Sequence, residues 1–280
     1  MKNWTNASLT SKSPRSERMK GKYQAVKAEA DSRSSAQPAA LPVSDRLVGR
    51  LQTPEALTPA QRDRMYALLA RYFANVTRPH FEHDLAEKEW VVLLTDTKYG
   101  QIQGFSTLMR LQVVVDSQPV VAFFSGDTII RQEYWGETAL PRLWAQHVFG
   151  LAEYICQARA YWFLISSGYK TYRFLPVFFK EFFPTYQCPT PPPIKRVLDA
   201  LGQLKFPGEY DAGSGLIRFV KSSPLRPDVA RITDRRLKDP HVAFFAAANP
   251  GHGQGDQLAC LVELTAANLT AAGRRMLGLR

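Results

Sequence analysis

The sequence predicts one mixed α/β domain over residues 45–280, in which an antiparallel meander is joined to a βαβ unit. Three apolar segments separated by short polar turns follow one another between residues 89 and 130, a spacing typical of antiparallel strands. A segment with helical periodicity and a further short apolar segment come next. Because a helix connects the last two apolar segments, we expect them to be parallel neighbours in one sheet.

Residues 1–44 differ in composition from the rest of the chain and are expected to form a disordered basic tail. They carry eight Lys or Arg against three Asp or Glu, and few aliphatic residues. Such a segment buries too little apolar surface to offset the entropy lost on ordering. The predicted organisation is therefore this tail followed by a single domain.

The formal net charge of the chain is +11. A basic surface suits nucleic acid, coenzyme phosphates, an acidic carrier protein or anionic lipid, so charge alone does not choose among these partners. No zinc-finger, RRM or basic-heptad pattern occurs, which argues against sequence-specific recognition of nucleic acid.

Cysteine and histidine usage argues against metal or disulfide frameworks. Cys156, Cys188 and Cys260 are far apart and form no Cys-x-x-Cys pair, which suits a reducing compartment. His80 and His83 have helical spacing, but a metal needs further ligands that the sequence does not place, so no metal is expected. With no apolar run of membrane-spanning length and no apolar signal core, we expect a cytoplasmic protein.

The sequence of the first half of the domain predicts two helices and four strands. Thr58 and Pro59 supply an N-cap and a proline at the first helical position, and Met65, Leu68 and Tyr72 follow at helical spacing. The expected elements are a strand at 46–51, helices at 59–74 and 79–87, and strands at 89–95, 101–115 and 119–130.

The second half begins with a long amphipathic helix. Leu140, Trp144, Val148 and Leu151 lie on one face of this segment, and a proline-rich break follows later, at residues 187–193. The expected elements are helices at 136–156, 170–183 and 194–204, strands at 161–165, 215–220 and 242–247, and a helix or strand at 257–264.

The segment from Ile129 to Leu140 stands between the third meander strand and the long helix. It reads Ile-Ile-Arg-Gln-Glu-Tyr-Trp-Gly-Glu-Thr-Ala-Leu. With the order of elements over roughly residues 50–245, this segment resembles the GNAT acyltransferases, whose turn of the form P-E-Y-[QR]-G-x-G-x-G precedes such a helix. The resemblance implies a GNAT-like sheet whose central parallel strands splay apart.

Within that turn, Glu133, Tyr134 and Gly136 match the family, whereas Thr138 and Leu140 replace its later glycines and a tryptophan replaces Gln or Arg. A helix N-terminus of this kind binds pyrophosphate. The resemblance therefore implies acyl-CoA or acetyl-CoA as co-substrate, or an acyl group on acyl-carrier protein, the type of donor used by the similar acyl-homoserine lactone synthases. The implied donor-binding residues are Ile129, Ile130, Arg131, Gln132, Trp135, Gly136, Thr138, Lys170 and Arg173.

Ser125, Gly126 and Asp127 interrupt an apolar strand. A glycine inside a strand often marks a bulge or a close backbone approach. In the resembling fold this strand splays from its parallel neighbour and the reactive carbonyl sits in the gap, so Asp127 is the candidate general base. The alternative is a structural aspartate that binds the amides of the bulge.

Residues 166–173 follow the strand expected at 161–165, and loops at the carboxyl ends of parallel strands line ligand crevices. Tyr172 is the candidate general acid for a leaving thiolate. Lys170 and Arg173 are candidates to hold phosphate or carboxylate. The alternative is a set of N-capping serines with a solvated basic helix start. The candidate substrate-binding residues here and nearby are Ser125, Ser166, Ser167 and Tyr169.

Two further features leave alternatives open. The Gly-rich loop 249–256 offers His252 and Asp256 as additional substrate-binding candidates, against the alternative of an ordinary polar turn. The phenylalanines of the next segment suit either a core or an apolar tunnel for a long acyl chain; they are Phe174, Phe178, Phe179, Phe182 and Phe183.

The preferred function is therefore an acyltransferase that moves an acyl group from a thioester donor to a small-molecule amine or hydroxyl acceptor. Transfer by direct attack is expected, because no Gly-x-Ser-x-Gly nucleophile elbow occurs. The alternatives are a non-catalytic ligand-binding or regulatory module of the same fold, and a nucleic-acid-binding protein.

Overall fold

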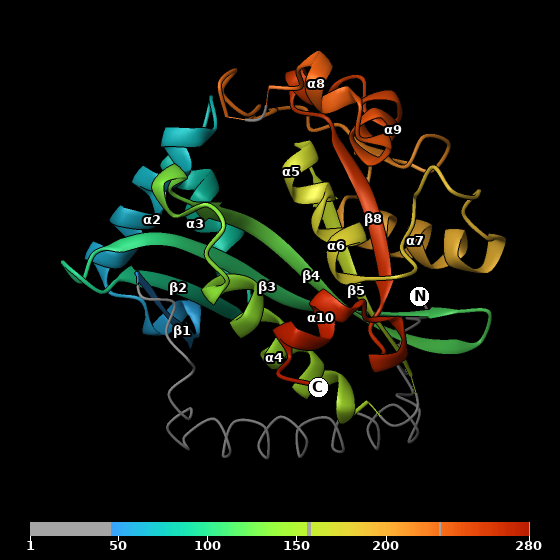
Figure 1. Cartoon of the computed structure of the whole chain (residues 1–280), viewed down its shortest axis with the longest axis horizontal. Helices are drawn as coiled ribbons and strands as arrows, with labels where there is room; N and C mark the ends of the chain where they lie inside the picture. Colours follow the sequence, from blue (N-terminus) through green and yellow to red (C-terminus); the bar gives the residue numbers. More distant parts are fainter. Residues whose placement is uncertain (1–45, 156–157, 230, 280) are drawn as a thin grey trace, which may run out of the picture. The chain divides into compact units, whose positions relative to one another are not determined.

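An eight-stranded mixed sheet organises the residues that the computed structural model describes, which are 46–155, 158–229 and 231–279 (Figure 1). Its strand order is β1-β2-β3-β4-β5-β8-β7-β6. The strands are β1 (Leu47–Gln52), β2 (Trp90–Asp96), β3 (Ile102–Val115), β4 (Gln118–Ile130), β5 (Arg159–Ser166), β6 (Tyr210–Asp211), β7 (Leu216–Ile217) and β8 (Gln257–Glu263). The predicted tail of residues 1–44 and Cys156 lie outside the described residues, so what was expected of them stays a prediction.

Strands β1 to β4 form the antiparallel part of the sheet, and the predicted three-strand meander β2-β3-β4 is confirmed. A two-residue turn joins β3 to β4. Asp116 and Ser117 in this turn have φ values of 49° and 62°. Positive φ at both positions matches the turn to the right-handed twist of the flanking strands. Strand β1 pairs with the outer edge of β2.

Strand β4 stays paired with its parallel neighbour β5 only along its first half. Pairing runs from Val120 opposite Arg159 to Ser125 opposite Leu164 and then stops. At the same point β4 bulges against β3, because the register shifts between Ser106 and Leu108. The prediction that these strands are parallel neighbours which diverge near Gly126 is confirmed, and so is the GNAT-like arrangement of a meander joined to a splayed parallel pair.

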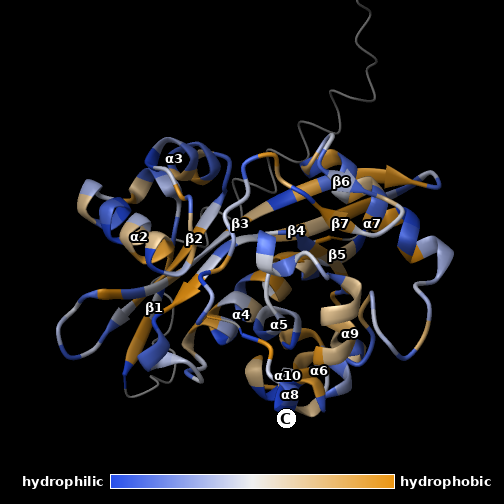
Figure 2. Ribbon diagram, turned by 90° about the horizontal axis from the view of Figure 1, so that it is seen from above, coloured by the Kyte–Doolittle hydropathy of each residue, from blue (hydrophilic) through white to orange (hydrophobic). Residues whose placement is uncertain are grey.

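Helices cover both faces of the sheet (Figure 2). One face carries α4, α9 and α10, whose apolar side chains pack on β4, β5 and β8. The opposite face carries α7 over β4 and β5, and α2 and α3 over β2 and β3. The helices are α2 (Pro59–Tyr72), α3 (Arg78–Ala86), α4 (Ala139–Glu153), α5 (Tyr169–Tyr172), α6 (Phe174–Phe178), α7 (Pro192–Lys205), α8 (Asp234–Leu237), α9 (Pro240–Ala248) and α10 (Ala271–Met276). Within the described ranges, no helix is long and apolar enough to cross a membrane.

The prediction of a strand at 242–247 is wrong, because these residues belong to helix α9. Asp239 caps this helix by accepting a hydrogen bond from the His241 N–H at 3.0 Å, and Pro240 occupies its first position. Apolar residues lie on every side of this helix, so the spacing of apolar residues in the sequence does not distinguish a buried helix from a buried strand. The segment left open as helix or strand is β8, which lies antiparallel beside β5.

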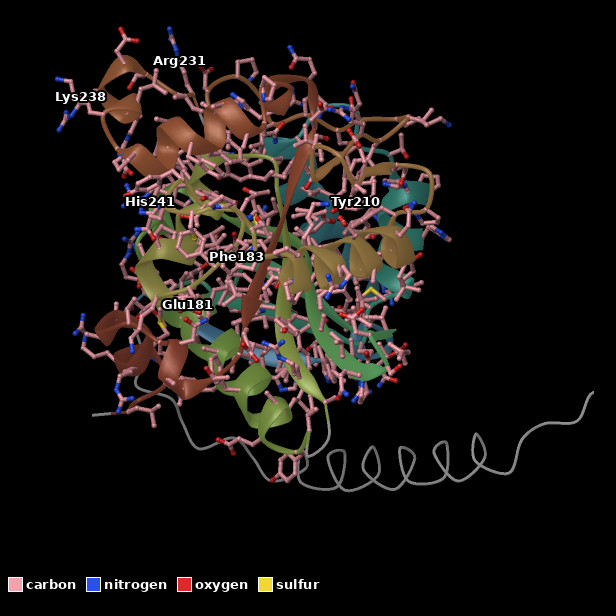
Figure 3. The ribbon with its side chains drawn as sticks, turned by 90° about the vertical axis from the view of Figure 1, so that its right-hand side faces the viewer. Glu181, Phe183, Tyr210, Arg231, Lys238 and His241 are labelled. Atoms are coloured by element: carbon pink, nitrogen blue, oxygen red, sulfur yellow. The ribbon has the colours of Figure 1, made fainter. Side chains whose placement is uncertain are left out.

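Two other predicted elements are shorter than expected. The helix predicted at 170–183 ends at Phe178 as the pair α5 and α6, and Phe183 bonds with Leu261 of β8 through both backbone groups (Figure 3). A residue that precedes proline, as Phe183 does, disfavours helix. The strand predicted at 215–220 reduces to β7, the two residues that pair with β8.

Two helix glycines give a matched test of how tightly α7 packs. A Cβ at Gly150 of α4 would meet nothing within 4 Å, whereas a Cβ at Gly202 of α7 would lie 2.7 Å from ring atoms of Tyr210. That ring is fixed, because the Tyr210 hydroxyl donates to Asp199 at 2.6 Å. We expect Gly150→Ala to raise the free energy of unfolding by about 0.5–1 kcal/mol, and Gly202→Ala to lower it by about 1–3 kcal/mol. Urea denaturation measures both changes, and equal stabilisation by the two variants would contradict this packing.

Candidate active site

A cleft of about 680 Å³ opens where β4 and β5 part. Its walls come from the end of β4, the turn before α4, the loop after β5, α6 and α10, together with the end of α2 and the segment 225–229. Many of the donor-binding residues predicted from the sequence lie together in this cleft, although they come from different segments of the chain. The predicted residues that line it are Ile129, Ile130, Trp135, Gly136, Thr138, Ser167 and Lys170.

The N-terminus of α4 forms one wall of this cleft. The helix begins at Ala139, and the side chain of its N-cap, Thr138, makes no capping hydrogen bond. Backbone N–H groups in a first helical turn have no intrahelical acceptor, and the helix dipole makes this end positive. Gly136 turns the chain toward the helix with a φ of 98°, and a Cβ there would meet nothing within 4 Å. Pro141 has no N–H, and the Arg142 N–H donates to the Thr138 carbonyl at 3.0 Å. The donors that this helix end offers to an anion are therefore the N–H groups of Ala139 and Leu140.

Basic side chains add to this positive potential. Among the described residues of the cleft wall, Arg142, Lys170 and Arg275 are basic and Glu137 is the acidic one. Lys170 donates to the Val229 carbonyl at 2.7 Å, and its Nζ lies 3.5 Å from the centre of the Trp135 ring. Burial, followed by the charge of Arg236, lowers the pKa of Lys170.

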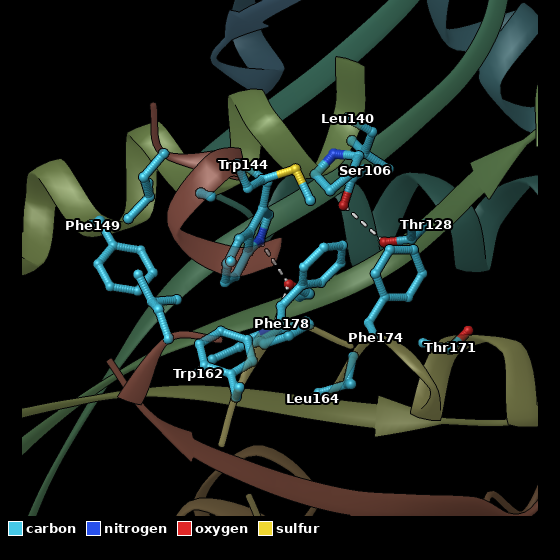
Figure 4. A pocket seen from close by; sticks show the side chains of 18 residues that line it. Ser106, Thr128, Leu140, Trp144, Phe149, Trp162, Leu164, Thr171, Phe174 and Phe178 are labelled. Carbon is cyan, nitrogen blue, oxygen red and sulfur yellow. Dashed lines mark hydrogen bonds between the residues drawn. The ribbon is translucent and has the colours of Figure 1, made fainter. Parts of the chain in front are cut away.

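A second, apolar cavity of about 90 Å³ adjoins the cleft, and Figure 4 shows the side chains that line it. The two spaces share wall residues, namely Thr128, Leu140, Pro141, Thr171, Phe174, Phe178 and Met276. The deeper wall is formed by Trp144, Ala145, Phe149, Trp162, Leu164, Phe179, Leu269 and Leu277. Three of the five phenylalanines that suited either a core or a tunnel therefore line this cavity, while Phe182 packs against Tyr172.

Hydroxyl side chains line the inner cavity, and that of Thr128 lines the cleft as well. Ser106 and Thr128 share a hydrogen bond of 2.8 Å between their side-chain oxygens. The Oγ of Ser125 accepts from the indole N–H of Trp144 at 3.0 Å and of Trp162 at 2.9 Å. Ser125, a predicted substrate-binding residue, thus lies in the inner cavity and ties α4 to β5.

Asp127 does not belong to the described walls of either space. Its charged neighbours are Asp84 and Lys88, which lie on α3 and just after it, across the sheet from α4. Lys88 is buried and pairs with Asp84 at 2.6 Å. Burial and the charge of Asp84 raise the pKa of Asp127 to about 7, against a smaller opposing effect of Lys88. The carboxyl therefore sits beside the bulge on the face opposite the cleft.

The structure does not support Tyr172 as a general acid. Its ring is fully buried, and its hydroxyl donates to the Pro184 carbonyl at 2.9 Å. Burial raises its pKa, with further contributions from Cys260 and Tyr186. Residues two apart on a helix face different directions, so Lys170 reaches the cleft while Tyr172 enters the core.

Arg173 and the Gly-rich loop are also placed away from the described cleft wall. Arg173 forms an ion pair with Asp239. Asp256 pairs with Arg218 at 3.3 Å, and the His252 ring lies against Phe245. These partners are contributed by later segments of the chain, which sequence spacing does not position.

The remaining candidates have local structural partners. Ser166 donates to the Gly168 carbonyl at 2.9 Å, and Tyr169 is buried. Arg131 pairs with Glu133 at 2.6 Å. The backbone N–H of Gln132 donates to the hydroxyl of Tyr72 at 2.8 Å, which fixes the turn against α2. In the described part of the chain, no group of three His, Cys, Asp or Glu is arranged to hold a metal.

Sequence reasoning missed α10, which brings Arg275 and Met276 to the cleft. The sequence contains one signal for this helix. Thr270 precedes the helix and caps it by accepting from the Gly273 N–H at 3.1 Å. Arg142 was not predicted as a cleft residue, because the sequence pattern places it only in the helix that follows the turn.

No family model matches the chain, and none of the curated proteins matches it. A probable N-acyltransferase of unknown function from Enterococcus faecalis matches 48% of this chain and 33% of its own, at 16% identity and a TM-score of 0.37. Saccharomyces cerevisiae N-myristoyltransferase with bound myristoyl-CoA matches 48% and 32%, at 9% identity and a TM-score of 0.37. An Escherichia coli GNAT-family N-acetyltransferase in complex with CoA matches 45% and 64%, at 20% identity and a TM-score of 0.30.

The matches thus span about a third of the first two of those proteins. At such identities and TM-scores they carry no statement about activity. The GNAT-like fold is recognised in this chain from its own sheet order and its splayed parallel pair.

The pKa of Asp127 predicts how stability depends on pH. Because its folded-state pKa is about 7, above the unfolded value of about 3.9, the folded state keeps a proton that the unfolded state loses between these values. The contribution of Asp127 to stability therefore falls as pH rises through this window. Asp127→Asn, which stays neutral, is therefore expected to exceed the wild type in melting temperature by an amount that is small at about pH 4, grows as pH rises and levels off above about pH 7.

Thermal denaturation from about pH 4 to about pH 8 measures this difference. Asp228→Asn, a change at an exposed aspartate, is the control and should track the wild type throughout. If Asp127→Asn instead loses stability at pH 8, the carboxylate is charged and its attraction to Lys88 outweighs its burial.

Proposed function

We propose that the protein is an acyltransferase that takes its acyl group from a CoA-type thioester and passes it to an amine or hydroxyl acceptor. One observation carries this proposal: a cleft lined by a helix N-terminus and basic side chains continues into an apolar cavity at the point where β4 and β5 part. A CoA thioester has the same two-part chemistry, with phosphates at one end and an acyl chain at the other.

The phosphates bind at the α4 N-terminus, where backbone N–H groups and the basic side chains Arg142, Lys170 and Arg275 converge. The thioester lies at the junction of the two spaces, beside Thr128. Beyond Ser125 the edge of β4 no longer pairs with β5, so its backbone donors are available to the oxyanion.

We place the acceptor beside Asp127, at the bulge where the two strands part. Asp127 takes the acceptor's proton, and its pKa of about 7 suits a base at neutral pH. The acceptor's lone pair attacks the carbonyl carbon, and collapse of the tetrahedral species expels the thiolate. Because a free thiol has a pKa of about 8.5, the thiolate leaves without a dedicated acid and takes its proton from water.

Adjacent arginines on α10 test the donor site. Arg275 lines the cleft and Arg274 is not among the described wall residues, while both are exposed. Loss of a hydrogen bond to a charged group is expected to weaken CoA binding by about tenfold or more in Arg275→Ala. Arg274→Ala should bind CoA as the wild type does. Titration calorimetry with CoA measures both, and equal affinities in the two variants would contradict this placement of the phosphates.

The base is tested by thiol release from acyl-CoA in the presence of a panel of amines and alcohols. Asp127→Asn is expected to reduce turnover by about 10²–10⁴-fold, with unchanged CoA affinity because Asp127 lies apart from the described cleft wall. Wild-type turnover should rise as pH rises through about 7. Full activity in the variant would remove Asp127 from the mechanism. CoA binding without turnover on any acceptor would favour a non-catalytic ligand-binding module.

A further inference from the structure

The inner cavity is walled by hydrocarbon. Its described wall consists mainly of Trp, Phe, Leu and Met side chains. Both indole N–H groups in this wall donate to Ser125, and Ser106 pairs with Thr128. A buried water needs two to four polar partners, so this space favours an apolar occupant over water.

The position and the volume of the inner cavity indicate which apolar group occupies it. The cavity opens onto the junction where the thioester is placed and runs along α4 from Leu140 toward Phe149. A dry cavity of about 150 Å³ accepts benzene, which has six carbons. In proportion, the 90 Å³ here take about four carbons beyond the thioester carbonyl. An acetyl group would leave most of this space empty.

We propose that this cavity binds the acyl chain of the donor, and that the protein prefers acyl groups of about four to six carbons over acetyl. The inference rests on the proposed function, because the chain reaches the cavity only from a thioester held in the cleft. The walls that set the length are α4, β5 and α10. Gly273 lets α10 close against α6, since a Cβ there would lie 2.4 Å from the Phe178 carbonyl.

Ala145 offers a direct way to shorten the cavity. It is buried in the inner wall on α4. Ala145→Leu fills the space from one side, whereas Ala152→Leu makes the same change two turns along the same helix, outside the described cavity wall. The second variant controls for any general effect on α4.

The experiment is calorimetry with CoA, acetyl-CoA, butyryl-CoA, hexanoyl-CoA and palmitoyl-CoA. Two further buried methylenes are expected to tighten binding of butyryl-CoA over acetyl-CoA by about 15-fold, and palmitoyl-CoA should gain nothing over hexanoyl-CoA. Ala145→Leu should reduce hexanoyl-CoA affinity at least tenfold and leave CoA affinity unchanged, while Ala152→Leu keeps the wild-type order. Equal affinity for all lengths, or an unchanged order in Ala145→Leu, would overturn the proposal.

1-Hexanol separates this inference from the donor assignment. Its binding is followed by the indole N–H NMR signals of Trp144 and Trp162, which lie in the cavity wall. If no CoA compound binds but hexanol shifts these signals in the wild type and not in Ala145→Leu, the chain-binding cavity is upheld and the CoA donor is wrong. If neither CoA compounds nor hexanol bind, both proposals are overturned.

Discussion

The bulge of β4 is the constraint on which the rest of the structure depends. Gly126 and Asp127 lie together opposite Thr107, and a Cβ at Gly126 would lie 2.5 Å from the Thr107 hydroxyl oxygen, so a larger residue here would displace the Thr107 side chain. The extra residue bends β4 away from β5, because a bulge increases local twist and ends regular pairing. One local feature thereby opens the cleft on the α4 face, frees the edge of β4, and sets a carboxyl on the opposite face.

Ser125 couples this parting of the strands to the helix that lines the cleft. It is the last residue of β4 that pairs with β5, and its hydroxyl oxygen accepts hydrogen bonds from Trp144 on α4 and Trp162 on β5. Each such bond contributes about 0.5–1.5 kcal/mol, and an indole N–H left unpaired in this core would cost more. The position of the α4 N-terminus is therefore tied to the place where the sheet opens.

The meander, α4 and the parallel pair were predictable from the sequence, because their signals are local: short turns, one apolar helical face, and a glycine inside a strand. The direction of Tyr172 was not, because it depends on the Pro184 carbonyl and on aromatic rings from α9. Helix α9 was misassigned because it is apolar all round, and β8 was left undecided for a similar reason. The basic residues of the cleft were only partly predictable from the sequence, since Arg275 comes from the far end of the chain.

The departures at Thr138 and Leu140 from the family turn acquire a physical meaning in this setting. Glycine at the second position would bring phosphate close to backbone, but Leu140 instead contributes a side chain to both the cleft and the inner cavity. The basic side chains Arg142, Lys170 and Arg275 supply positive charge at the same wall. Under the proposed function, binding of the donor is redistributed from backbone contacts with the phosphates toward side-chain charge and apolar contact with the acyl chain. A site of this kind gains affinity with each methylene that it buries, which is why the loss of the glycines is compatible with a thioester donor.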